Sequence, residues 1–395
     1  MKKILKLAIF IIVLILLYFL FEPVANYNIG KKSIPNLENL TIEKKTGFSK
    51  ADSILKLEYL KLNTPAISVA VGRNNKVIWS NQIGYSDIEN KVKVNSLTKF
   101  RIGSTSKALT SAGIGILLQE NKLNLNSLVK DFVPYASANL SNLTLAQIAS
   151  HTSGIRNYKT CFCFPIWEYY NNDEYQSVKK SVGIFNGDKL LFQPGTDFSY
   201  SSYNFALLSA MIEGSSEINF IDFMSDNIFK PLDLQHTSTE KASKIKNIAT
   251  FYDFEDNNYV ASFKVNNSNK IAGGGFISTP IDLVKFGNAL LNNQIINNTT
   301  TTTLFTPVKL KNGTINKQNY AIGWRNDIST KVFSDKRKTN IIHHGGVAVG
   351  STSLLILVPE YNITVAILIN NNSKSFNLFD TAYKFIELFT TENKQ

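Results

Sequence analysis

The sequence predicts a mixed α/β fold of the α+β kind, in which one antiparallel sheet is flanked by terminal helices and carries an inserted, mostly helical subdomain. Three observations predict it. Apolar hairpins lie near opposite ends of the 395-residue chain, a helical pattern flanks each hairpin on its outer side, and residues 105–230 between them are mostly helical in pattern. With 44% apolar residues, a chain of this length can bury one large core.

The elements follow from the spacing of apolar residues, which is near 3.6 in helices and 2 in strands. The expected elements are a helix over 53–60, strands over 66–71 and 77–79, helices over 107–118 and 204–213, strands over 353–358 and 363–369, and a helix over 376–389. Gly214 is positioned to end the second of the middle helices, because glycine often terminates helices. Joining the two terminal hairpins gives the single sheet.

Residues 1–22 are predicted to be an N-terminal membrane anchor. Three lysines precede the apolar run of residues 7–21, and Pro23 makes a poor cleavage site, although a cleaved signal peptide is the alternative. The lysines orient the N-terminus toward the cytoplasm, so we expect a single-pass protein of the bacterial inner membrane with its main domain on the periplasmic side. Residues 23–45 are predicted to form a linker and residues 46–395 the folded domain.

The net charge of +12 does not indicate a nucleic-acid partner, because the lysines are scattered and form no compact basic tract. Cys161 and Cys163 are separated by one residue, so a disulfide between them would be strained and a metal site would lack further ligands. We assign them no role. His151 and His236 fall in no ligand spacing, and we expect no metal.

Ser104 and Lys107 form a candidate nucleophile and its activator. The pattern S-x-x-K occurs seven times in the chain, but only here does it join a strand end, a glycine at position 103 and a buried helix. Residues three apart share a helix face, so the amine would lie within reach of the hydroxyl. A serine hydroxyl attacks carbonyls poorly without a nearby proton acceptor. The alternative is that Ser104 merely caps the helix.

Two further segments carry candidate site residues. Tyr200 and Ser202 lie in a loop before a helix, and Tyr200 would serve as a second base only if a cation such as Lys107 favoured its phenolate. His343 and Gly345 would point to one face of a strand and His344 to the other, so only one histidine can face a site. The alternatives are a packing tyrosine and a surface histidine pair.

Together, these three segments resemble the motif trio of the serine β-lactamase and penicillin-binding protein superfamily: S-x-x-K, Y-x-N or S-x-N, and K-T-G or H-x-G. The chain looks most like the class C-type branch, and within it the mitochondrial β-lactamase-like serine proteases and their bacterial relatives. The resemblance covers about residues 63–370 and implies a β-lactamase/transpeptidase-like fold with the active site between sheet and helical subdomain. Ser202 replaces the asparagine of Y-x-N, and His343 would replace the lysine of K-T-G.

The resemblance implies a serine hydrolase that forms an acyl-enzyme on peptide, ester or amide substrates, without a cofactor. Ser104 would be acylated, Lys107 would activate it and Tyr200 would relay protons. The backbone N–H groups of Ser104 and Gly346 would bind the oxyanion, beside Gly345. A catalytically idle module that binds peptidoglycan peptides or self-associates is the alternative. The oligomeric state is not predicted.

Overall fold

The computed structural model describes residues 2–29, 31–32, 48–159, 167–240, 246–255, 258–372 and 377–391. The helices are α1 Lys2–Ile29, α2 Ser49–Leu62, α3 Ser106–Gln119, α4 Val129–Phe132, α5 Ala138–Ser141, α6 Leu145–Ala149, α7 Val178–Gly183, α8 Ser202–Ser216, α9 Phe220–Met224, α10 Pro280–Leu291, α11 Asn298–Phe305 and α12 Leu378–Thr391. The strands are β1 Lys31–Lys32, β2 Ala66–Arg73, β3 Lys76–Asp87, β4 Val92–Lys93, β5 Phe100–Arg101, β6 Ser238–Thr239, β7 Tyr252–Glu255, β8 Asn258–Ala261, β9 Phe276–Ser278, β10 Arg325–Ser329, β11 Thr339–Ala348, β12 Ser351–Val358, β13 Ile363–Ile369 and β14 Asn371–Asn372.

The central sheet joins the two ends of the chain, as the sequence predicts. Its strand order is β10-β11-β12-β13-β2-β3-β4, and every neighbouring pair is antiparallel. The two predicted hairpins meet where β13 pairs with β2, with Ile363 opposite Arg73 and Ile369 opposite Ile67. The α+β fold with a central antiparallel sheet built from both ends of the chain is therefore confirmed, and two smaller sheets, β1-β8-β7-β14 and β5-β9-β6, accompany it.

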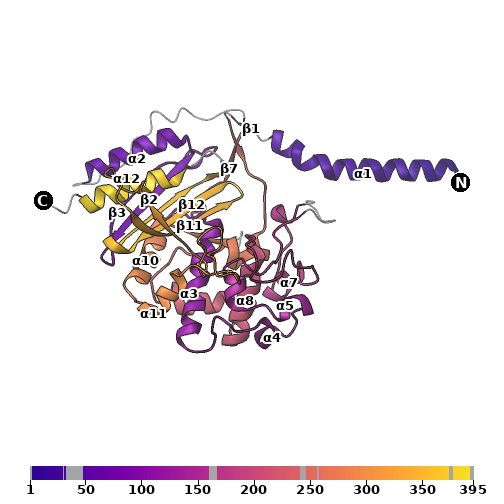
Figure 1. The fold of residues 1–395 in the computed structure, drawn as a ribbon. Helices are drawn as coiled ribbons and strands as arrows, with labels where there is room; N and C mark the ends of the chain where they lie inside the picture. The colour runs from indigo at the N-terminus through magenta and orange to yellow at the C-terminus, as the bar shows by residue number, and fades with distance from the viewer. Residues whose placement is uncertain are drawn as a thin grey trace.

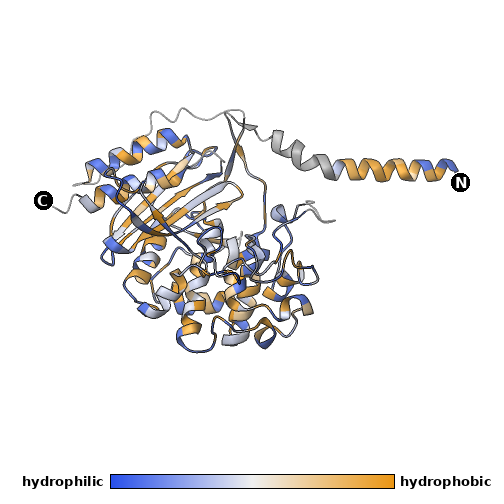
Figure 2. Cartoon of the chain, in the orientation of Figure 1, coloured by the Kyte–Doolittle hydropathy of each residue, from blue (hydrophilic) through white to orange (hydrophobic). Residues whose placement is uncertain are grey.

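Each face of this sheet carries its own layer of helices. Successive residues of a strand point to opposite faces, so Ile67 and Val69 of β2 pack with α2 and α12, whereas Ala66 and Ala70 face the larger core. In Figure 1, α2 and α12 cover one face, and α3, α8, α10 and α11 lie on the other side. In Figure 2 the strands of the central sheet are largely coloured as hydrophobic, and so are parts of the helices beneath them and a long stretch of α1.

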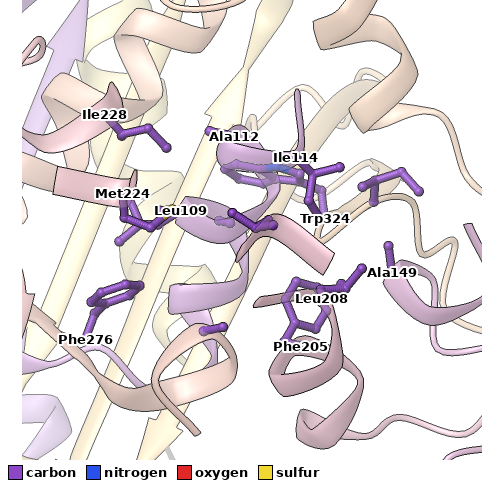
Figure 3. Close-up of a cluster of buried hydrophobic side chains, with 14 of the residues drawn as sticks. Leu109, Ala112, Ile114, Ala149, Phe205, Leu208, Met224, Ile228, Phe276 and Trp324 are labelled. Carbon is purple, nitrogen blue, oxygen red and sulfur yellow. The ribbon is translucent and has the colours of Figure 1, made fainter. Parts of the chain in front are cut away.

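The helical subdomain is built around α3 and α8. Figure 3 shows Leu109, Ala112 and Ile114 of α3 among side chains from other elements, which come from α6, α8, the segment after α9 and strand β9. Trp324, just before β10, is completely buried in the same core and stacks on Phe286 with ring centroids 6.3 Å apart. This packing fixes the position of the helix that follows Ser104.

Gly214 does not end α8 as the sequence analysis expects. The helix continues to Ser216, and Glu217 closes it in the left-handed conformation with φ 60°. A Cβ atom at Gly214 would lie 1.9 Å from the carbonyl oxygen of Phe132. The glycine is therefore explained by the close approach of the segment ending α4, not by termination of the helix.

The N-terminal prediction needs a correction. Helix α1 extends away from the rest of the molecule (Figure 1), but no helix in the described part of the chain is long and apolar enough to cross a membrane. The run of residues 7–21 lies between Lys6 and Glu22 and, at about 1.5 Å per residue, measures about 22 Å, against a hydrocarbon layer of about 30 Å. The predicted anchor and membrane partner are thus not found. Residues 23–29 of the predicted linker continue α1, and residues 33–45 lie outside the described residues.

Candidate active site

Ser104 lies in a short turn that joins the strand β5 to the helix α3. The turn is a 3-10 helix over Gly103–Thr105, and Gly103 has φ 48°. A Cβ atom at Gly103 would lie 2.6 Å from the carbonyl oxygen of Val347, so a glycine is required there both by conformation and by space. The turn places the Ser104 hydroxyl beside strand β11, in a partly buried position.

Lys107 is completely buried on the first turn of α3 and contacts three groups. Its Nζ lies 3.1 Å from Ser104 Oγ, 3.2 Å from Ser202 Oγ and 2.5 Å from the carbonyl oxygen of Gly273. Burial holds the pKa of Lys107 well below its ordinary value, and the charges of Arg325 and Lys270 lower it further. An amine in this environment favours its neutral form, which can accept a proton.

Tyr200 reaches the same serine from the loop before α8. Its hydroxyl lies near enough to the Ser104 side chain for that side chain to affect its pKa, and Lys107 Nζ lies 4.9 Å from its ring centroid. Burial raises the pKa of Tyr200 to about 12, although the Ser104 side chain and the charge of Arg325 act in the opposite direction. The expectation of a cation-stabilised phenolate is therefore not what the surroundings favour, because Lys107 is itself pushed toward neutrality. Tyr200 is placed to donate a proton.

Ser202 contacts the Lys107 amine from the first residue of α8. Its backbone N–H donates to Asn157 Oδ1 at 3.2 Å, and its side chain lies near enough to the Tyr158 hydroxyl to oppose the rise that burial causes in the pKa of that phenol. Ser202 thus contacts the amine through its hydroxyl and the facing loop through its backbone N–H. Asn157 and Tyr158 line the same cavity but were not singled out from the sequence, where nothing marks them.

The two histidines of β11 point to opposite faces of the sheet, and His344 is the one on the side of the serine. His343 Nε2 lies 2.8 Å from Asp327 Oδ2, and its ring packs on Phe379 of α12 at 4.9 Å. His344 Nε2 lies 2.8 Å from the Tyr320 hydroxyl. Strand alternation predicts that one histidine faces the site, but the structure brings His344, not His343, to it.

His344 belongs to a buried cluster beside Tyr200. Its Nδ1 donates to the carbonyl oxygen of Gly345 at 2.7 Å, so Nε2 of the neutral ring accepts from Tyr320. Burial and the charges of Arg325 and Lys107 hold the pKa of His344 well below its usual value. The ring centroid of His151 lies 4.3 Å from the ring centroid of Tyr200 and 4.5 Å from that of Tyr320.

His151 is held as a neutral ring by its own hydrogen bonds. The backbone N–H of Ser201 and the side-chain amide of Asn204 both approach Nδ1, at 3.3 and 2.9 Å, so this nitrogen accepts and the proton lies on Nε2. Burial lowers the pKa of His151 well below its usual value. Arg325, whose guanidinium carbon lies 5.5 Å from the Tyr200 ring centroid, supplies a fixed positive charge beside these neutral groups.

Gly346 lies directly against the turn that holds Ser104. A Cβ atom at Gly346 would be 2.0 Å from the carbonyl oxygen of Ile102 and 2.9 Å from the backbone nitrogen of Ser104. At Gly345, the same addition would meet only the carbonyl oxygen of Ser353, at 3.7 Å. The strand can therefore approach Ser104 only without a side chain at position 346.

Replacing Gly346 by alanine is expected to lower kcat/KM by about 100-fold, because the backbone must shift by a substantial fraction of an ångström beside the serine. Gly345→Ala is the matched control and is expected to change kcat/KM by less than about threefold. Initial rates of activated-ester hydrolysis would measure both. Equal rates for the two variants would contradict the proposed approach of β11 to Ser104.

A cavity of about 230 Å³ opens beside the serine. It is lined by Ser104, Asn157, Tyr158, Tyr169, Tyr200, Ser202, Asn267, Lys270, Gly273, Gly274, Val347 and Ala348. His344, Tyr320 and Arg325 do not line it and lie near Tyr200 instead. Cys161 and Cys163 lie outside the described residues. Within the described ranges, no group of three His, Cys, Asp or Glu side chains is arranged to hold a metal ion.

The relation to known proteins follows from a family model described as Beta-lactamase, which matches residues 52–386. The chain belongs to this family. The predicted resemblance is therefore confirmed. The chain is a member of the serine β-lactamase-like hydrolases.

Among curated relatives, the serine beta-lactamase-like protein LACTB, mitochondrial, from Homo sapiens is 29% identical over 383 residues, covering 76% of this chain and 70% of that protein. A penicillin-binding protein homologue from Pyrococcus abyssi, described as octameric, has a TM-score of 0.72 at 20% identity over 87% of this chain and 77% of its own. D-amino acid amidase from Ochrobactrum anthropi SV3 has a TM-score of 0.71 at 19% identity over 87% and 98%. These two structures confirm the fold. The predicted location in a bacterial inner membrane is also contradicted, because the human relative is described as mitochondrial.

Proposed function

We propose that this member of the Beta-lactamase family is a serine hydrolase that cleaves amide, peptide or ester bonds through an acyl-enzyme at Ser104. One observation carries the proposal: the amine of Lys107, which burial pushes toward its neutral form, lies 3.1 Å from Ser104 Oγ. A neutral amine at hydrogen-bonding distance can take the proton from the hydroxyl as the oxygen attacks a carbonyl carbon.

The site residues then divide the reaction between them. As the Ser104 oxygen bonds to the carbonyl carbon, its proton passes to Lys107, and backbone N–H groups of Ser104 and Gly346 stabilise the oxyanion. Tyr200, which lines the cavity together with Ser104, gives a proton to the leaving group as its bond to carbon breaks. Lys107, which holds the proton taken from Ser104, then returns a proton to Tyr200. In the second half of the reaction a water molecule takes the place of the leaving group. Tyr200 accepts its proton and passes one to Lys107 as the water oxygen bonds to the ester carbon, and Lys107 protonates the Ser104 oxygen as its bond to carbon breaks.

We include amides among the proposed substrates because one of the proteins with this fold is named D-amino acid amidase. The replacement of the Y-x-N asparagine by Ser202 leaves the Lys107 contact in place at 3.2 Å. This contact supports a competent site and argues against the idle binding module, for which loss of the polar contacts around Lys107 would be expected.

The test is covalent trapping of Ser104. The protein is incubated with a fluorophosphonate, digested and analysed by mass spectrometry, and the adduct is expected on the peptide that contains Ser104. Ser53→Ala is the matched control, because Ser53 and Lys56 form another S-x-x-K pair, with Ser53 exposed on α2. The Ser53→Ala variant should be labelled like the parent, and Ser104→Ala should not. A folded parent that takes no label would overturn the proposal and favour the idle module.

A further inference from the structure

Lys270 is a buried amine in the wall of the cavity beside Ser104. It ends a short 3-10 turn over Asn267–Lys270 that leads into the glycines at 273–275, and only 5% of its surface is exposed. A lysine is almost never buried to this extent unless it is paired. The acyl-transfer steps above do not use this residue.

The partners of Lys270 leave its ammonium group incompletely satisfied. Nζ donates to the carbonyl oxygen of Tyr169 at 3.0 Å and stands 4.3 Å from the ring centroid of Tyr169 and 5.1 Å from that of Tyr158. An ammonium group has three N–H donors, and the part of the chain that the structure describes forms no ion pair with this one.

Glu240, the carboxylate whose charge acts on Lys270, is already engaged elsewhere. Glu240 accepts from Arg101 Nε at 2.7 Å and from Arg101 Nη2 at 2.8 Å, and it also accepts from Asn267 at 3.2 Å. This two-point pairing satisfies Glu240 and leaves Lys270 facing the cavity with two aromatic rings around it. An anion entering the cavity would supply the missing partner.

We propose that Lys270 recognises a carboxylate carried by the acyl part of the substrate, so that the hydrolase prefers anionic acyl groups. The inference rests on the proposed function of Ser104. The acyl part is assigned to this cavity because Lys270, Gly273 and Ser104 line it together. Tyr200, which gives the proton to the leaving group, also lines the cavity, but its neighbours His344, Tyr320 and Arg325 do not, and the leaving group is assigned to their side of Tyr200.

The preference depends on pH in a defined direction. Burial, followed by the charge of Arg101, lowers the pKa of Lys270 to about 7, while Glu240 opposes the shift. The described titratable or charged groups that face it are Arg101 of β5, Glu240 after β6, Tyr158 and Tyr169 of the facing loop, and Lys107 of α3. Since only the protonated amine attracts a carboxylate, KM for an anionic substrate should rise as pH rises through about 7.

The test compares mono-4-nitrophenyl glutarate with 4-nitrophenyl valerate, two esters of similar length that differ by one terminal carboxylate. At pH 6, Lys270→Met is expected to lower kcat/KM for the glutarate ester by at least about tenfold and for the valerate ester by less than threefold. Lys270→Arg should recover part of the preference. Lys264→Met, which removes an exposed lysine, is the control for the loss of one charge.

The outcomes separate this inference from the proposed function. If the parent hydrolyses both esters and Lys270→Met changes both rates equally, Lys270 does not recognise the carboxylate. The proposed acyl transfer at Ser104 is then unaffected. If the parent hydrolyses neither ester, the proposed function fails, and calorimetric binding of glutarate at pH 6 to the parent and to Lys270→Met decides the role of Lys270. Equal binding by the two proteins would overturn it.

Discussion

Replacing Lys107 by methionine is expected to lower kcat/KM for ester and amide hydrolysis by about 1,000-fold or more, with little change in the fold. Methionine keeps the buried volume of the side chain, but it cannot accept the Ser104 proton, and a positioned general base contributes on the order of 100- to 10,000-fold. Initial rates with an activated ester measure the effect. A Met variant that keeps a tenth of the parent rate would show that another group activates Ser104.

The stability of the same variant provides an independent control. In the folded parent, burial disfavours the charged Lys107, whereas the unfolded chain binds a proton at this lysine up to about pH 10.5. The unfolded state therefore holds more protons between the lowered folded-state pKa and 10.5, and the stability of the parent rises with pH in that window. Lys107→Met lacks this term. Urea denaturation should show the parent gaining stability relative to the variant from neutral pH toward 10.5.

Tyr200→Phe is expected to lower kcat by about 100-fold for amides and alkyl esters and far less for 4-nitrophenyl esters. A phenol held protonated by a pKa of about 12 can donate to a basic leaving group, whereas 4-nitrophenolate leaves without a proton. The ratio of the two rates is therefore the informative quantity. It is measured with a matched amide and 4-nitrophenyl ester of the same acyl group.

Tyr135→Phe is the control for this experiment. Burial also raises the pKa of Tyr135 to about 12, but that residue lies between α4 and α5 in the helical subdomain. Its loss should leave both rates within about threefold. An equal loss of amide and 4-nitrophenyl ester hydrolysis in Tyr200→Phe would contradict proton donation to the leaving group and would indicate a role in positioning Ser104.

Much of the fold could be predicted because its elements carry local patterns. The strands of the two terminal hairpins are apolar runs bounded by turns, and the structure places the hairpins at 66–87 and 351–369; three strands match the prediction within two residues, whereas β3 continues to Asp87, well beyond the predicted 77–79. The pairing of Ser104 with Lys107 is also local, since three residues along a helix fix it. By contrast, a glycine is required at position 214 by the close approach of Phe132, and no local sequence pattern predicts this contact.

The rest of the site depends on tertiary packing. Alternation along β11 requires His343 and His344 to face opposite ways, but the choice between them is made by Asp327 and Phe379 on one side and Tyr320 on the other. Lys270 is one lysine in a lysine-rich chain, and only its burial beside Ser104 distinguishes it. The charge state of Lys107 also required the structure, because it follows from desolvation.

The contacts between the Ser104 turn and strand β12 have a consequence for synthesis of the protein. Ser104 and Lys107 emerge early from the ribosome, but the turn that holds them is bonded to residues far downstream: Thr105 Oγ1 lies 2.8 Å from Ser353 Oγ, and Ser353 donates to the Ile102 carbonyl oxygen at 2.7 Å. Such distant contacts form slowly and only once both partners exist. A nascent chain of 300 residues therefore carries the nucleophile without the strand that faces it, and hydrolytic activity should arise only after β11 to β13 have been made.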